Sequence, residues 1–178
     1  EYPAHMGAWP LLWLGWRDVI RPTSDSLMVL GPLATGAPVL EFWFQGESNP
    51  EHFLIENRQR MSFDRNLMSE GLIVYEVDDN VMALGVPSNR VNAGVTPGLR
   101  LIEADGLFDL VAGRNRGDER DPFPGYLGST VFDDGTRPST RSYRGAPTNI
   151  ALRAIEPLGD DMRFQLQVRA AGWDTPTA

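Results

Sequence analysis

The chain of 178 residues contains no cysteine and no lysine, and it has only two histidines. Without cysteine there are no disulfides, thiolate zinc sites or cysteine nucleophiles. Without lysine there is no Schiff-base chemistry and no phosphate-loop lysine. His5 and His52 lie far apart in the sequence and do not match the His-Glu-x-x-His spacing of a zinc helix. We therefore expect both histidines to be structural and the chain to contain no catalytic residue of its own.

Long apolar runs and excess positive charge are also missing. No apolar run reaches the roughly 20 residues of a membrane helix. The formal net charge of −8 argues against nucleic acid and anionic membranes as partners. No basic, apolar leader is visible at Glu1, and the first residue is not methionine, so we expect this to be an excised or processed piece of a longer protein. The length suits one domain that buries roughly 70% of its unfolded surface.

Hydrophobic periodicity predicts one helix followed by strands. A short helix, interrupted by Pro10, is predicted over 3–16 because large apolar residues recur at spacings of three and four: Met6, Trp9, Trp13 and Trp16. From residue 26 onward, alternating apolar residues between Gly, Pro, Asn and Asp clusters predict strands at 27–30, 39–45, 52–58, 72–77, 81–84, 99–103 and 130–132.

The clearest pattern is near the end of the chain. Residues 162–168 alternate apolar and polar without a break, and 150–154 precede them across a short loop, which predicts a β-hairpin. We predict a mainly β protein with antiparallel sheets or a sandwich, one short N-terminal helix and long loops rich in Gly, Pro and Asp. In this scheme 1–25 is a helical segment continuing from an upstream half, 26–170 is the β-rich domain, and 171–178 is a C-terminal tail.

Acidic, turn-rich loops separate the later strands. The segment 116–125 holds three carboxylates, two glycines and two prolines, so it suits neither helix nor ordinary strand. Calcium takes about six to eight oxygen ligands from carboxylates and carbonyls, which such loops can supply. The candidate ligands are Asp105, Asp118, Glu119 and Asp121. A solvated acidic loop with arginine partners fits the same pattern, so the residues alone leave both interpretations open.

A pair of carboxylates is a second possible site. Glu56 and Glu76 fall in neighbouring predicted strands, and two carboxylates facing each other across a site are what glycosidases use. The residues favour a structural role for Glu56, because Arg58 and Arg60 follow it closely and would pair with a buried carboxylate.

Five blocks in order resemble the immune inhibitor A family of secreted zinc metallopeptidases. The first is PAHMGAW at 3–9, ending in LGW at 14–16, and the second is HFLIENRQ at 52–59. The third joins FD at 63–64 to GLIVYEVD at 71–78. The fourth joins EADG at 103–106 to GDERDPFPG at 117–125. The last comprises Pro138-Ser139, Tyr143, Gly145, TNI at 148–150 and the final hairpin. The resemblance thus covers about 3–168.

This resemblance implies a β-rich, C-terminal part of a secreted, extracellular metallopeptidase domain that is noncatalytic alone. It implies that zinc is bound only in an upstream half, that the partner is this half, and that the substrate is a protein or peptide. The chain would complete the substrate cleft, with His5 and Glu76 near it, and would hold a structural calcium ion.

Three departures from the family pattern qualify this picture. The His-Glu-x-x-His motif is absent, Glu76 stands where the family usually has histidine, and His52 stands where an aromatic residue is common. Two alternatives therefore remain. One is a standalone β-sandwich module that binds carbohydrate or a surface protein through Trp43, Tyr126 and the acidic loops. The other is a catalytically dead relative that keeps the scaffold for interaction.

Overall fold

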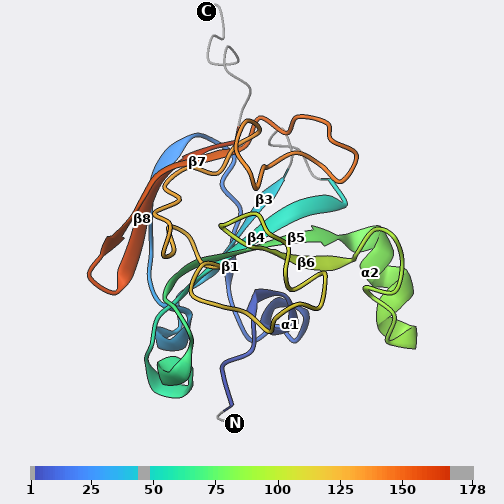
Figure 1. Cartoon of the computed structure of the whole chain (residues 1–178), viewed down its shortest axis with the longest axis horizontal. Coiled ribbons are helices and arrows are strands. Elements are labelled where there is room, and N and C mark those ends of the chain that lie inside the picture. Colours follow the sequence, from blue (N-terminus) through green and yellow to red (C-terminus); the bar gives the residue numbers. More distant parts are fainter. Residues whose placement is uncertain (1–2, 44–48, 169–178) are drawn as a thin grey trace, which may run out of the picture.

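Most of the regular structure is β in the computed structural model, which describes residues 3–43 and 49–168 (Figure 1). The described strands are β1 (Val19–Ile20), β2 (Ser26–Leu30), β3 (Val39–Trp43), β4 (Glu51–Arg58), β5 (Gly71–Asp78), β6 (Leu99–Ile102), β7 (Ala151–Leu158) and β8 (Asp161–Gln167). The helical segments include α1 (Ala8–Trp13), α2 (Asp79–Gly85) and the short 3-10 turns η1 (Leu33–Thr35), η3 (Ser62–Asn66) and η4 (Val86–Ser88). The predicted mainly β class is confirmed.

The strands form two sheets that face each other. One sheet has five strands in the order β1-β3-β4-β5-β6, and only its β1–β3 pair is parallel. The other has three antiparallel strands in the order β2-β8-β7. In Figure 1 the β7–β8 hairpin and β2 lie at one side, with the larger sheet crossing the centre. The predicted terminal hairpin is therefore present as β7 and β8.

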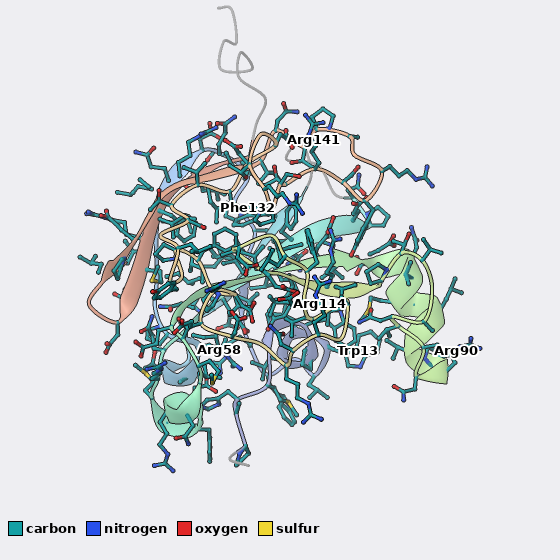
Figure 2. The ribbon with its side chains drawn as sticks, in the orientation of Figure 1. Trp13, Arg58, Arg90, Arg114, Phe132 and Arg141 are labelled. Atoms are coloured by element: carbon teal, nitrogen blue, oxygen red, sulfur yellow. The ribbon has the colours of Figure 1, made fainter. Side chains whose placement is uncertain are left out.

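The main core lies between the two sheets. Alternate residues of the larger sheet point to it, including Leu40, Phe53 and Val74, and they meet Phe164 of β8. Phe132, from the long loop before β7, is fully buried among them, with its ring 5.6 Å from Phe53 (Figure 2). A smaller core on the other face of the five-stranded sheet packs α1 against β4 and β5.

Three details differ from the sequence-based expectations, and two predicted segments are untested. The N-terminal helix is confined to Ala8–Trp13, shorter than 3–16. The predicted strand at 81–84 is wrong: this segment belongs to α2, because the Asp78 carboxylate caps the helix by accepting from the Asn80 and Val81 amides. Segment 130–132 makes only a single bridge, between Phe132 and Leu152. The end of the predicted strand 39–45 and the tail 171–178 lie outside the described residues.

The long connection from β6 to β7 is held by buried apolar residues such as Phe123 and Phe132 and also by polar contacts. The Asp134 carboxylate accepts from the backbone amides of Thr148 and Asn149 and from the Thr140 hydroxyl. Although burial alone would raise the pKa of Asp134, these hydrogen bonds hold it below its ordinary value. The carboxylate therefore ties 134 to 140 and to 148–149 within this connection. None of the helices in the described ranges has the length and apolar character of a membrane span.

Candidate functional site

The outer face of the five-stranded sheet, which packs against α1, carries charged side chains under the helix. Leu54 and Val77 on this face contact the small core around Ala8 and Leu11. Since side chains alternate along a strand, Glu56 and Arg58 share the face of Leu54. Both are buried, and Glu56 has no exposed surface. Charged groups in such a place need partners.

Arg58 is the centre of a buried network on this face. Its guanidinium donates to the backbone carbonyl of His5 at 2.8 Å and to that of Met6 at 3.2 Å. It also lies 3.6 Å from a Glu56 carboxylate oxygen and 3.3 Å from an Asp64 carboxylate oxygen. Asp64 in turn accepts from the His5 amide at 2.8 Å. Arg58 thus fastens the segment before α1 to the sheet.

Glu56 lies at the bottom of this network. The Tyr75 hydroxyl donates to its Oε1 at 3.0 Å, whereas Oε2 is buried and accepts no hydrogen bond from the described residues. Burial raises the pKa of Glu56 from its ordinary 4.5 to about 7, against the opposing effects of Arg58 and Tyr75. Loss of hydration of the charged form is the main cause, and the nearby Asp64 carboxylate adds a smaller rise because it shares Arg58 with Glu56.

The N-terminal segment passes very close to these side chains. A Cβ added at Gly7 would lie 2.8 Å from the Tyr75 hydroxyl oxygen. A glycine is therefore required where the chain crosses Tyr75 before α1 begins. The close approach to Tyr75 thus explains the glycine of the GAW sequence in the first block.

The second block, ENRQ at 56–59, divides its residues between the two faces of the sheet. Glu56 and Arg58 serve the network under α1. Asn57 points the other way and donates to the carbonyls of Leu30 and Asp160, at 2.9 and 2.8 Å, which ties β4 to the three-stranded sheet. The Gln59 amide donates to Asn57 Oδ1 at 2.8 Å. The expectation that Glu56 is a structural carboxylate beside Arg58 agrees with this geometry.

A pocket of about 300 Å³ adjoins the network, and we call it the sheet-face pocket. Its floor includes Arg58, Ile73 and Tyr75 of the sheet. Its remaining walls come from the 67–69 turn and from the loop with Asp118 and Asp121. A mostly apolar hollow with a few convergent polar groups is the usual form of a ligand site.

No protein-family model, curated protein or solved structure matches this chain. Its possible function must therefore be argued from the residues and their geometry.

Two of the predicted calcium ligands, Asp118 and Asp121, line the sheet-face pocket, and three of the four carboxylates accept a hydrogen bond from a backbone amide. The Asp121 carboxylate accepts from the Asp118 amide, Asp118 accepts from the Arg120 amide, and Asp105 accepts from the Leu107 amide. Glu119 is exposed. Within the described ranges, no three His, Asp or Glu side chains are grouped so that they could hold a metal ion. The loop therefore has a structural explanation, and calcium stays a prediction.

Electrostatics still favour Asp121 as the residue most sensitive to a cation. It is 6% exposed, and burial together with the Asp118, Glu103 and Asp105 carboxylates raises its pKa to about 6. Its hydrogen bond from the Asp118 amide opposes this rise. A bound cation would relieve the repulsion among these carboxylates.

We expect millimolar calcium to raise the melting temperature of the chain relative to excess chelator. A ligand at 100 times its dissociation constant adds about 2.7 kcal/mol, or roughly 5–10 °C for this size. Differential scanning calorimetry of the wild type, Asp118→Ala and Asp121→Ala checks this, with Asp160→Ala on the β7–β8 turn as control. A melting temperature indifferent to calcium would leave these carboxylates with a structural role only.

The remaining site candidates are separated by the sheet. His5 joins the network through its backbone, and its ring lies edge-on to Phe63 with centroids 5.2 Å apart. Glu76 pairs with Arg100 on the opposite face, the face of the main core, and burial raises its pKa to about 7. The structure thus does not bring His5 and Glu76 together. Glu56 lies opposite Ile73 and Glu76 opposite Phe53, so the expectation that the two glutamates face each other is wrong.

Proposed function

We propose that this chain is the β-rich, noncatalytic part of a secreted, extracellular zinc metallopeptidase domain of the immune inhibitor A type. The supporting observation is that the first three sequence blocks meet in one buried network. Arg58 of the second block binds the His5 and Met6 carbonyls of the first, while Asp64 of the third binds the His5 amide. Residues that carry the resemblance therefore depend on one another physically, as they would in a shared scaffold.

An exposed apolar stretch around α1 suggests where the rest of such a domain would pack. Trp13 and Trp16 are 65% and 64% exposed, and Met6, Leu14 and Ile20 are also exposed. Trp13 stacks on Trp9, with ring centroids 5.3 Å apart, so its orientation is fixed. Large exposed apolar groups of this kind mark interaction surfaces. The proposal assigns this α1 surface to contact with the zinc-bearing half.

The sheet-face pocket would then form one wall of the substrate cleft. It lies on the same face of the sheet as α1, and apolar side chains such as Ile73, Leu101 and Leu110 line it. These groups suit an apolar side chain of a protein or peptide substrate. Cleavage itself belongs to the other half in this proposal, because zinc there would supply the activated water.

Complementation tests the proposal. The chain is mixed with the zinc-bearing half of an immune inhibitor A-type peptidase, and cleavage of a quenched fluorescent peptide is followed. We expect activity only in the mixture. We expect Trp13→Glu/Trp16→Glu to reduce it roughly tenfold or more, because buried tryptophans at interfaces are commonly worth about 2 kcal/mol each.

Val95→Glu is the matched control, since Val95 is a fully exposed apolar residue in another loop. It should leave the activity of the mixture unchanged. If the zinc-bearing half is equally active with and without the chain, the proposal is wrong.

A standalone binding module is the second candidate, and one observation favours it. Tyr126, which we expected in such a module, is 68% exposed at the mouth of a separate pocket. Trp43 lies in β3, but its side chain is outside what the structure describes.

A further inference from the structure

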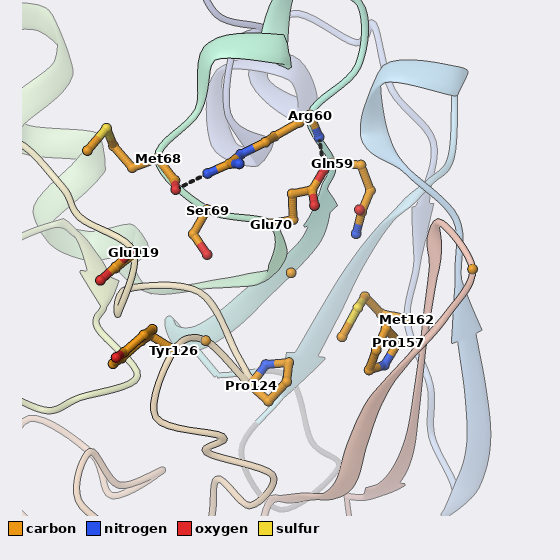
Figure 3. A pocket seen from close by; sticks show the side chains of 13 residues that line it. Gln59, Arg60, Met68, Ser69, Glu70, Glu119, Pro124, Tyr126, Pro157 and Met162 are labelled. Carbon is orange, nitrogen blue, oxygen red and sulfur yellow. Dashed lines mark hydrogen bonds between the residues drawn. The ribbon is translucent and has the colours of Figure 1, made fainter.

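A second pocket, of about 400 Å³, opens where the ends of the two sheets meet, and we call it the end pocket (Figure 3). One wall comes from 59–60 and 68–71, between β4 and β5. Another comes from 119 and 124–126, and a third from Pro157, Gly159 and Met162 of the β7–β8 hairpin. Figure 3 shows Glu119 and Tyr126 on one side of the hollow and Met162 with Pro157 on the other.

The polar groups in the end pocket are mostly acceptors. Gln59 is 8% exposed; its amide nitrogen donates to Asn57, while its Oε1 accepts nothing from the described residues. The Glu119 carboxylate makes no hydrogen bond or ion pair within the described ranges. Glu70 uses one oxygen to accept from the Arg60 amide at 2.7 Å, which leaves its second oxygen. A ligand that fits these groups must donate hydrogen bonds.

The one cation of the lining is already engaged. The Arg60 guanidinium donates to the carbonyl of Met68, so its side chain extends along the rim toward Met68 (Figure 3). The lining itself therefore carries a net negative charge, from two carboxylates and one occupied arginine, while the Arg120 guanidinium lies outside the lining, over the Tyr126 ring. Complementary charge favours a cationic ligand.

The apolar parts of the end pocket suit the stem of a long basic side chain. Pro157 is exposed and offers an apolar wall, backed by the almost fully buried Met162, against which the methylene groups of arginine or lysine can lie. The Tyr126 ring already has one guanidinium near it, that of Arg120 at 5.9 Å, so its electrostatics accept a planar cation. Guanidinium also matches carboxylates with two parallel hydrogen bonds, which ammonium cannot do.

We propose that the end pocket binds the arginine side chain of an extended polypeptide. The stem lies along Met162 and Pro157, and the guanidinium donates to Glu119, Glu70 and the Gln59 carbonyl oxygen. This inference concerns a site separate from the α1 surface and does not depend on the proposed peptidase role.

Titration with short peptides tests the inference. The ¹⁵N-labelled chain is titrated with acetyl-Ala-Arg-Ala-amide, its lysine analogue and its citrulline analogue, which keeps the shape but lacks the charge. We expect shifts confined to the Gln59 side-chain amide and the backbone amides of Gly71, Gly125 and Gly159. Citrulline should bind about fivefold more weakly than arginine, as expected for partly exposed charge pairs. Added salt should narrow that difference.

A matched pair of variants separates this pocket from general acidity. Glu119→Gln should weaken arginine-peptide binding by about fivefold. Glu156→Gln removes one exposed carboxylate on β7, outside the lining, and should leave binding unchanged. Any of three results would overturn the inference. The citrulline peptide could bind as tightly as the arginine peptide, or the chemical-shift changes could map outside the end pocket. Finally, Glu119→Gln and Glu156→Gln could bind the arginine peptide with equal affinity.

Discussion

Arg58→Met is expected to lower the free energy of unfolding by about 3–5 kcal/mol, because it leaves buried carboxylates without their cation. Glu56 and Asp64 both face Arg58, and neither side chain has any appreciable contact with solvent. The same substitution frees the His5 and Met6 carbonyls that Arg58 holds. For a chain of this size, the melting temperature should fall by on the order of 10 °C. Thermal and urea unfolding followed by circular dichroism measure this loss.

Arg163→Met is the control for Arg58→Met. Arg163 also pairs with a glutamate, Glu156, but both side chains are nearly half exposed, so the pair contributes about 1 kcal/mol or less. Arg58→Lys adds a second comparison: it keeps the charge but loses the fork that reaches two carbonyls, so it should fall between wild type and Arg58→Met. A loss no larger than that of Arg163→Met would show that Arg58 does not fasten the N-terminal segment.

The elements that the sequence predicts correctly are those whose apolar and polar residues alternate regularly along a short stretch of chain. The terminal hairpin was predictable because 162–168 alternate strictly, and β8 does bury Met162, Phe164 and Leu166. The apolar residues of 81–84 carry no helical period over so short a length, so the sequence pattern predicts a strand where the structure has α2. The segment is helical because the Asp78 side chain caps its first turn, although its apolar residues alone favour a strand.

The network and the pockets depend on tertiary contacts that a strand pattern does not contain. Arg58 and Glu56 are close in the sequence, so their pairing is predictable. Arg58 also binds the backbone carbonyls of His5 and Met6, and no side-chain pattern in the sequence indicates a contact to a backbone carbonyl. Alternation alone does not say which face of the five-stranded sheet is covered by α1 and which by the other sheet. For this reason Glu56 and Glu76 were placed together, although adjacent strands in this register put them on opposite faces.

In the acidic loops, too, the sequence shows which groups are present but not which contacts they make. Composition alone is compatible both with a calcium site and with a solvated acidic loop paired to arginines at 116–125. In the structure, Asp118 and Asp121 accept from backbone amides within their own loop, as turn residues do. The number of carboxylates follows from the sequence. The conformation of the backbone determines which of their oxygens accept hydrogen bonds from amides and which are left to bind an ion.

Glu56→Gln is expected to change the pH dependence of stability. The pKa of Glu56 is about 7 in the folded chain and near 4.5 when unfolded, so between these values the folded state holds more protons. Stability contributed by this group is therefore complete below pH 4.5 and is lost as the pH rises to 7. The loss is about 3 kcal/mol, because a pKa difference of one between the two states corresponds to about 1.4 kcal/mol. Glu76, whose pKa is raised in the same way, adds a loss of the same sign in the wild type.

Glutamine cannot ionise, so the variant does not lose the stability that the wild type loses when Glu56 ionises between pH 4.5 and 7. Its Oε1 can still accept from Tyr75, and Arg58 keeps Asp64 as its counter-ion. At pH 4.5 we expect Glu56→Gln to match the wild type or to be less stable by about 1 kcal/mol, because its amide brings a buried donor. By pH 8 the difference should have moved by about 3 kcal/mol in favour of the variant. Urea unfolding at both pH values, with Glu156→Gln as the control for one lost carboxylate, measures this change. A difference that stays constant from pH 4.5 to 8 would mean that Glu56 has the same pKa in the folded and unfolded chain, and that its buried surroundings stabilise its charge as fully as water does.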